Sequence, residues 1–281
     1  MNHRFTLSML LLLLSLAAGA EELTKIISYN TLLTFNRAQR VEEAASYLRD
    51  QKADIILFQE ISRQNSDSFA RLARLWGHSH AVVAKPWDDY SIALTSKEPF
   101  EMVEVRLDGM HHGYILVKIR GVYYMSLHFS SFTYARVIQE SEIIVKRVKP
   151  LLASGARVVL AGDCNNPSPY DAAQVNSDAG MLEWRRFRER PEVETLRNGF
   201  FDFQAIQNLF DAGLEDVCFF WMKRNHYDPQ LRLRVDLALL PRNLEDKVVA
   251  AYIDVSRRKY LETISDHYPL VLVLRDLHKE E

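Results

Sequence analysis

Short apolar runs that end in a polar side chain recur along the whole chain, and they constrain the fold more than any other feature. Amphipathic stretches with helical spacing separate several of these runs. We expect strands at residues 25–30, 54–60, 91–95, 114–119, 121–128, 157–163, 232–240 and 268–275, and helices at residues 40–51, 66–75, 138–152, 181–190 and 202–211. Strands outnumber helices and short turns join many of them, so the pattern favours a layered α/β fold with packed sheets over a purely doubly wound sheet.

The first twenty residues have the pattern of a secretory signal. Arg4 precedes an apolar stretch over residues 7–16, and the small residues 17–20 follow it. We expect cleavage after Ala20, export to the periplasm or the medium, and one domain over residues 21–281 with no stable membrane span. An N-terminal anchor is the alternative, but the apolar stretch is short for a span.

The net charge does not support the hypothesis that the protein binds long nucleic acids. The formal net charge is −2, and it becomes −3 once Arg4 is removed with the leader. Arginines between residues 185 and 190 and the basic triplet at residues 257–259 are candidates for a local groove, with solvated charged faces as the alternative.

The two cysteines, Cys164 and Cys218, leave two possibilities open. In an oxidising compartment they could bridge and brace the polar segment around Cys164, or they could stay free and buried as small apolar residues. The spacing along the chain does not decide between them.

Glu60 and Asn30 are candidate metal ligands because each follows an apolar run. A carboxylate that closely follows an apolar run is costly in a core but suits a strand end beside a cation. The structural alternatives are a helix cap for Glu60 and a turn for Asn30.

The segment from Gly162 to Pro167 holds a second candidate set. Glycine allows close backbone approach, and the spacing of two between Asp163 and Asn165 places both side chains on one side of an extended segment, where they could face one phosphate. A turn closed by Pro167 is the alternative.

Asp236 lies within an apolar run and therefore needs a partner. His267 can supply it, because a buried carboxylate that accepts from one ring nitrogen fixes the tautomer and leaves the other nitrogen free for a water. His128 ends an alternating strand, where a histidine is either structural or catalytic.

These segments, in this order, resemble the endonuclease/exonuclease/phosphatase superfamily of divalent-metal phosphoesterases. The resemblance runs over nearly the whole mature chain. It implies a four-layer α/β sandwich, with two packed mixed β-sheets flanked by helices and the site at one edge. It is carried by Ile26-Ile27-Ser28-Tyr29-Asn30, Ile55-Ile56-Leu57-Phe58-Gln59-Glu60, Ser126-Leu127-His128, Leu160-Ala161-Gly162-Asp163-Cys164-Asn165, Arg234-Val235-Asp236 and Ser265-Asp266-His267.

The resemblance also implies roles for single residues. Glu60 would bind Mg²⁺ or Mn²⁺ with Asn30 close by, and Asp266 would assist the metal or its hydrogen-bond network. Asp163 and Asn165 would position the water and the phosphate.

Asp236 would orient His267 as the general base. His128 matches the histidine that contacts the phosphate or acts as acid in the deoxyribonuclease-like and sphingomyelinase-like branches.

Two departures from the family pattern bear on the substrate. Cys164 replaces the usual aromatic residue between Asp163 and Asn165, and His111-His112-Gly113 stands where many relatives carry a basic residue before the glycine.

We expect a monomeric, exported, Mg²⁺-dependent phosphodiester hydrolase. Its substrate would be a nucleic acid, a lipid head group or an inositol phosphate. The alternative is a catalytically silent binding protein on the same scaffold, but the candidate polar residues are all present.

Overall fold

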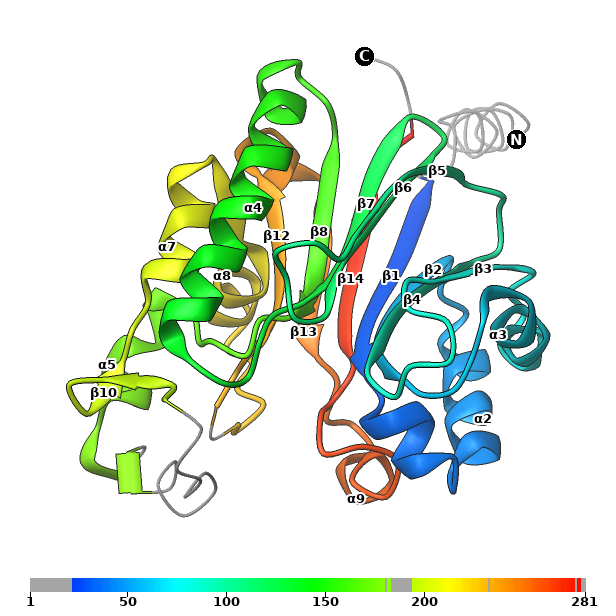
Figure 1. Ribbon diagram of the computed structural model, residues 1–281, viewed down its shortest axis with the longest axis horizontal. Coiled ribbons are helices and arrows are strands. Elements are labelled where there is room, and N and C mark those ends of the chain that lie inside the picture. The colour runs from blue at the N-terminus through cyan, green and yellow to red at the C-terminus, as the bar shows by residue number, and fades with distance from the viewer. Residues whose placement is uncertain (1–21, 180, 183–193, 232, 276, 279–281) are drawn as a thin grey trace, which may run out of the picture.

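The computed structural model describes residues 22–179, 181–182, 194–231, 233–275 and 277–278. Two six-stranded sheets pack face to face in the centre, and helices cover their outer faces (Figure 1). The predicted four-layer sandwich is confirmed.

The first sheet has the order β13-β14-β1-β2-β4-β3. Its β1 and β2 are parallel and its other neighbours are antiparallel, so the sheet is mixed. The strands are β1 (Leu23–Asn30), β2 (Ile55–Ile61), β3 (His80–Val83), β4 (Ser91–Ser96), β13 (Val248–Ile253) and β14 (Leu270–Arg275). Helices α2 (Val41–Gln51) and α3 (Ser66–Ala73) lie on its outer face, and α9 (Arg258–Leu261) precedes β14.

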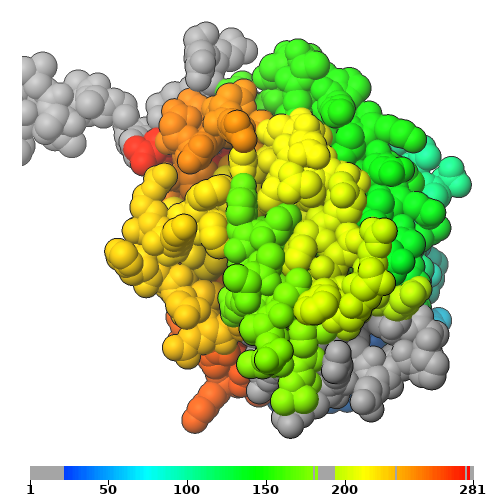
Figure 2. Space-filling model, turned by 90° about the vertical axis from the view of Figure 1, so that its left-hand side faces the viewer, coloured from blue at the N-terminus to red at the C-terminus, as the bar shows by residue number. Residues whose placement is uncertain are grey.

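The second sheet repeats this plan with the order β11-β12-β8-β7-β6-β5 and one parallel pair, β7 with β8. The strands are β5 (Glu101–Arg106), β6 (Gly113–Ile119), β7 (Val122–His128), β8 (Val158–Asp163), β11 (Leu214–Asp216) and β12 (Asp236–Pro241). Helices α4 (Tyr134–Ala153), α5 (Ala172–Val175), α7 (Gln204–Asp211) and α8 (Val217–Arg224) lie on this side of the molecule, with the short pair β9 (Leu196–Arg197) and β10 (Phe200–Phe201). Figure 2 shows that face, which the segments that hold α5, α7 and α8 share.

Alternation along the strands creates separate apolar layers. Ile26 faces the core between the sheets, whereas its neighbour Ile27 packs under α2 and α3. A third cluster, which includes Leu160, fills the space between the second sheet and α4 and α7. Both faces of the central strands are therefore buried, which explains their nearly continuous apolar runs.

The cysteines lie on opposite faces of the second sheet. Cys164 belongs to the cluster under α4 and α7, and Cys218 belongs to the core between the sheets. Both are buried and free. The bridged alternative is wrong, because the sheet itself separates the two sulfur atoms.

Several predicted elements need correction. The strand expected at residues 232–240 begins only at Asp236 and runs to Pro241. Arg234, before the strand, directs its guanidinium to Asp216 and Asp171 (2.7 Å each). Most of the helix expected at residues 181–190, and the arginines between 185 and 190, lie outside the described residues. The edge strand β5 and the aromatic helix α8 are absent from the sequence prediction.

Residues 32–38 have a left-handed backbone directly after β1. Their φ angles lie between 48° and 61°, in a region that side chains other than glycine rarely adopt. Hydrogen bonds from Thr31 Oγ1 to the carbonyls of Gln59 and Glu60, and from Asn36 to the Thr263 carbonyl, fasten this segment beside the polar strand ends. Among the described residues, no helix is both long and apolar enough to cross a membrane.

Candidate active site

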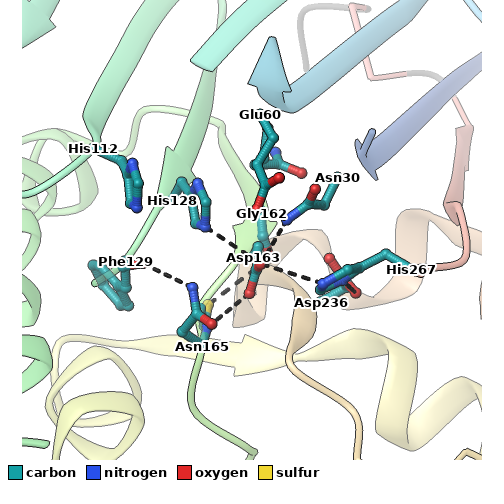
Figure 3. A network of polar contacts seen from close by, with 12 residues as sticks. Asn30, Glu60, His112, His128, Phe129, Gly162, Asp163, Asn165, Asp236 and His267 are labelled. Atoms are coloured by element: carbon teal, nitrogen blue, oxygen red, sulfur yellow. Dashed lines mark hydrogen bonds and ion pairs between the residues drawn. The ribbon is translucent and has the colours of Figure 1, made fainter. Parts of the chain in front are cut away.

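Polar residues at or near the ends of separate strands meet at one edge of the sandwich. Asp236 lies opposite Asp163 in the β12–β8 register, and His128 lies beside Asp163 in the β7–β8 register. Asn30 and Glu60 reach the same place from the first sheet (Figure 3). The site therefore forms across the gap between the two sheets.

Asp163 lies at the centre of this group and is almost completely buried. Its Oδ2 accepts from Asn30 Nδ2 (2.9 Å) and lies 3.4 Å from His128 Nε2 and 3.7 Å from His267 Nε2. Burial alone raises the pKa of Asp163, but the two imidazoles lower it below its ordinary value. Asp163 is therefore a carboxylate in the folded protein at neutral pH.

Asp236 and His267 form the expected pair. His267 Nδ1 donates to Asp236 Oδ2 (2.8 Å), so its Nε2 is turned toward Asp163. Burial lowers the pKa of His267, but the carboxylates of Asp236 and Asp163 outweigh it and raise the pKa well above 6.5.

Ser265 was missed as part of this arrangement, although it belongs to the same short motif as His267. Its hydroxyl donates to the Asn30 carbonyl (2.7 Å) and accepts from the backbone N–H of His267 (3.1 Å). One serine therefore joins the end of β1 to the loop that carries the histidine.

The chain matches the profile of the Endonuclease/Exonuclease/phosphatase family over residues 27–267. This protein belongs to the endonuclease/exonuclease/phosphatase family. The match includes every strand-end residue described above, so the resemblance seen in the sequence is confirmed. Membership supports a hydrolytic phosphoesterase.

Solved structures of the same fold are similar along almost their full length. One is an AP endonuclease from Archaeoglobus fulgidus, with a TM-score of 0.66, 22% identity, and coverage of 89% of this chain and 99% of that one. A second is the 3'-5' exonuclease NExo from Neisseria meningitidis, with a TM-score of 0.65, 20% identity, and coverage of 89% and 98%. A third is a variant of the 3' phosphatase NExo from Neisseria bound to a product DNA hairpin, with a TM-score of 0.64, 19% identity, and coverage of 89% and 98%. No curated protein matches the sequence.

Glu60 reaches the family site through a β-bulge rather than from a strand end. The register between β2 and β4 shifts between Phe58 and Ile61, and Glu60 has a φ of 58°. The bulge turns the side chain toward Asn30, whose Nδ2 donates to Glu60 Oε1 (3.2 Å). The expectation that β2 ends at Glu60 is therefore wrong by one residue.

The sequence predicted an extended segment at Asn165, and this prediction is wrong. It has a φ of 44°, its backbone N–H donates to Asp163 Oδ1 (2.8 Å), and its amide donates to the Phe129 carbonyl (2.9 Å). The turn alternative describes its conformation, because β8 ends at Asp163. Asn165 shapes the loop beside the site, with its amide nitrogen already engaged.

His128 is buried and stacks on His112, a contact that the sequence did not predict. The ring of His112 lies 3.9 Å from that of His128 at an angle of 6° (Figure 3). Burial and the neighbouring imidazoles hold the pKa of His112 far below its ordinary value, so this ring is neutral. The hairpin register that pairs Gly113 with His128 is the signal that could have found the contact.

The donor set fits a hard divalent cation. Ligand atoms of Asp163, Asp236 and His267 all lie within 4.8 Å of one another, and the buried Oδ1 of Asp236 has no hydrogen-bond partner among the described residues. Asn30 holds Glu60 against Asp163 with one amide group. Carboxylate oxygens of this kind suit Mg²⁺ or Mn²⁺.

Asp266, the third expected metal residue, is exposed. It forms none of the hydrogen bonds that join Asp163, Asp236 and His267. Its charge adds to the field that raises the pKa of His267.

Proposed function

We propose that this protein is an exported, monomeric phosphodiesterase that depends on Mg²⁺ or Mn²⁺. The observation that carries the proposal is the Asp236–His267 pair, whose free ring nitrogen faces Asp163 beside Glu60 and Asn30. Hydrolysis of a phosphate ester requires a base, a carboxylate that orients it and a group of carboxylate oxygens, and all three lie together here.

His267 is the general base in this proposal. Asp236 holds the ring so that Nε2 faces the reacting centre, and Asp163 lies within reach of the same nitrogen. The raised pKa of His267 arises from the uncompensated carboxylates around it, and a cation bound to them opposes that rise.

His128 lies on the other side of Asp163 and is suited to stabilise the departing oxygen. The departing oxygen of a phosphate ester is an alkoxide that needs a proton or a donor, and His128 is placed to supply one.

Glu60 and Asp163 are the residues that would hold the metal, and Asn30 orients both carboxylates through its amide nitrogen. When bound, the cation supplies charge to neutralise the phosphoryl oxygens and lowers the pKa of a bound water. The residues around it orient the imidazole and keep the carboxylates in place.

The substrate is a phosphate ester, and nucleic acid is one candidate because the NExo structure from Neisseria was solved with a DNA hairpin. Lipid head groups and inositol phosphates are the other candidates. A nuclease that binds several phosphates loses affinity steeply with salt, so plasmid DNA and sphingomyelin vesicles assayed at low and moderate salt separate the classes.

Hydrolysis of bis(p-nitrophenyl) phosphate tests the proposal. We expect activity that EDTA abolishes and Mg²⁺ or Mn²⁺ restores, and losses of roughly 10²-fold or more in Glu60→Ala and His267→Ala. Near-normal turnover in either variant contradicts the assigned roles. Activity unchanged by EDTA contradicts the metal.

Export is tested by sequencing the N-terminus of protein recovered from the periplasm or the medium. Cleavage after Ala20 is the expected result. An intact leader on protein from the cytoplasm would contradict it. The mass of purified protein in solution tests the monomer.

A further inference from the structure

A run of aromatic rings leads from the central carboxylate of the site toward the surface. His128 Nε2 lies 3.4 Å from Asp163, and His112 stacks on His128 at 3.9 Å (Figure 3). The ring of His111 lies 4.0 Å from that of His112, and the ring of Phe132 lies 5.0 Å from that of His111. Phe132 is 43% exposed, so the run ends in solvent.

A second exposed ring joins the run from another loop. Tyr90 lies 6.2 Å from His112 and is 47% exposed. His111 is also exposed. We call Tyr90, His111 and Phe132 the ring surface.

Hydrogen bonds fix the three loops that carry these rings. Glu140 is buried on α4 and accepts from the backbone N–H of His111 (2.6 Å) and of Ser130 (2.8 Å). The ring of His112 contacts the Tyr90 carbonyl through Nδ1 (3.2 Å). The ring surface is therefore organised before any ligand binds, which lowers the entropic cost of binding.

The position of the ring surface relates it to the departing group. His267 and His128 each direct Nε2 at the same oxygen of Asp163. In an in-line displacement at phosphorus, the water attacks on one side and the departing oxygen leaves on the other. If His267 activates the water, His128 and the ring surface beyond it lie on the departing side.

The ring surface presents aromatic faces rather than free charge. Two neighbouring cations are paired: Lys85 lies 3.6 Å from Asp88, and Arg136 lies 3.2 Å from Glu140. A planar, uncharged group suits such a surface, and every nucleobase has such a face.

We propose that the ring surface binds the base of the nucleotide that departs from the scissile phosphate, which makes nucleotide diesters the substrate class. This inference rests on the proposed function. It assigns Tyr90, His111 and Phe132 as residues that determine specificity.

Two substrates test the inference: a dinucleoside monophosphate, and its analogue that lacks the base on the departing side. Phe132→Ala and Tyr90→Ala should lower kcat/KM for the first about tenfold, as expected for loss of one stacked base, and should change the second less than about twofold. Phe220→Ala is the matched control, because Phe220 is 36% exposed and lies on α8 among Tyr170 and Phe219. It should leave both values unchanged.

Equal losses on both substrates would overturn the inference, because the rings would then only brace His128. If Phe132→Ala and Tyr90→Ala lowered activity only on sphingomyelin vesicles, the inference would also be overturned, in favour of a membrane contact. If wild-type protein hydrolyses no phosphate ester, the proposed function fails by itself. Calorimetry with adenosine monophosphate then tests the ring surface separately: weaker binding by Phe132→Ala than by Phe220→Ala supports the inference, and equal binding refutes it.

Discussion

Replacing Asp236 by asparagine removes the charge that holds His267 but keeps the size of the side chain. The interaction that loses its charge is a partly buried hydrogen bond of 2.8 Å from an imidazole to a carboxylate. Hydrogen bonds to charged groups contribute about 1.5–3 kcal/mol. Since about 1.4 kcal/mol is tenfold in rate, we expect kcat to fall between about 10-fold and 150-fold.

The assay is steady-state hydrolysis of bis(p-nitrophenyl) phosphate at saturating Mg²⁺, with Asp236→Asn, His267→Ala and the double variant compared. If Asp236 acts only by orienting His267, the double variant should be no slower than His267→Ala alone. The loss should appear in kcat rather than KM, because the pair contacts the reacting centre.

A matched control is Asp54→Asn, at the other end of β2. Asp54 accepts from the Lys25 N–H (2.8 Å) far from the site, so its replacement should change kcat less than about twofold. A double variant whose loss equals the product of the two single losses would refute the reasoning, since Asp236 and His267 would then act independently.

Three further predictions concern stability and are measured by chemical denaturation. Gly162→Ala places a methyl group 2.0 Å from the Leu127 carbonyl oxygen and should destabilise the protein by about 3 kcal/mol. Burial lowers the pKa of His78 to about 4, below its value in the unfolded chain. As the pH falls, the unfolded state therefore takes up the proton first, and about 3 kcal/mol of stability should be lost between pH 6.5 and pH 4. The variant His78→Gln should reduce this loss. Arg234→Met leaves the buried carboxylate of Asp216 and the partly buried carboxylate of Asp171 without their cation and should cost about 3–5 kcal/mol. A loss under about 1 kcal/mol would contradict the importance of these ion pairs.

The turn at Arg120 and Gly121 shows which local features the sequence predicts well. The β6–β7 hairpin turns there, and both residues have positive φ angles, 46° and 83°. The helix expected at residues 40–51 is confirmed as α2 because its apolar spacing matches one helical face. Edge strand β5 was not predicted because its charged, exposed residues lack a buried face to set the pattern.

The sequence predicted part of the candidate site, because a carboxylate within an apolar run is unstable unless a partner lies beside it. Asp236 required a partner, and His267 is that partner. The conformation of Asn165 was not predictable, because a turn and an extended segment of the same residues differ only in backbone angles that the loop's contacts select.

The sequence alone determined the strand-rich layered fold, the family and the residues that end the strands, since side-chain period and residue type are local properties of the chain. Only the tertiary structure decided how these residues face one another. The bulge that turns Glu60, the stack of His112 on His128 and the separation of Cys164 from Cys218 all depend on how two sheets pack and where their loops lie. Such contacts join residues far apart in the chain, so no local pattern records them.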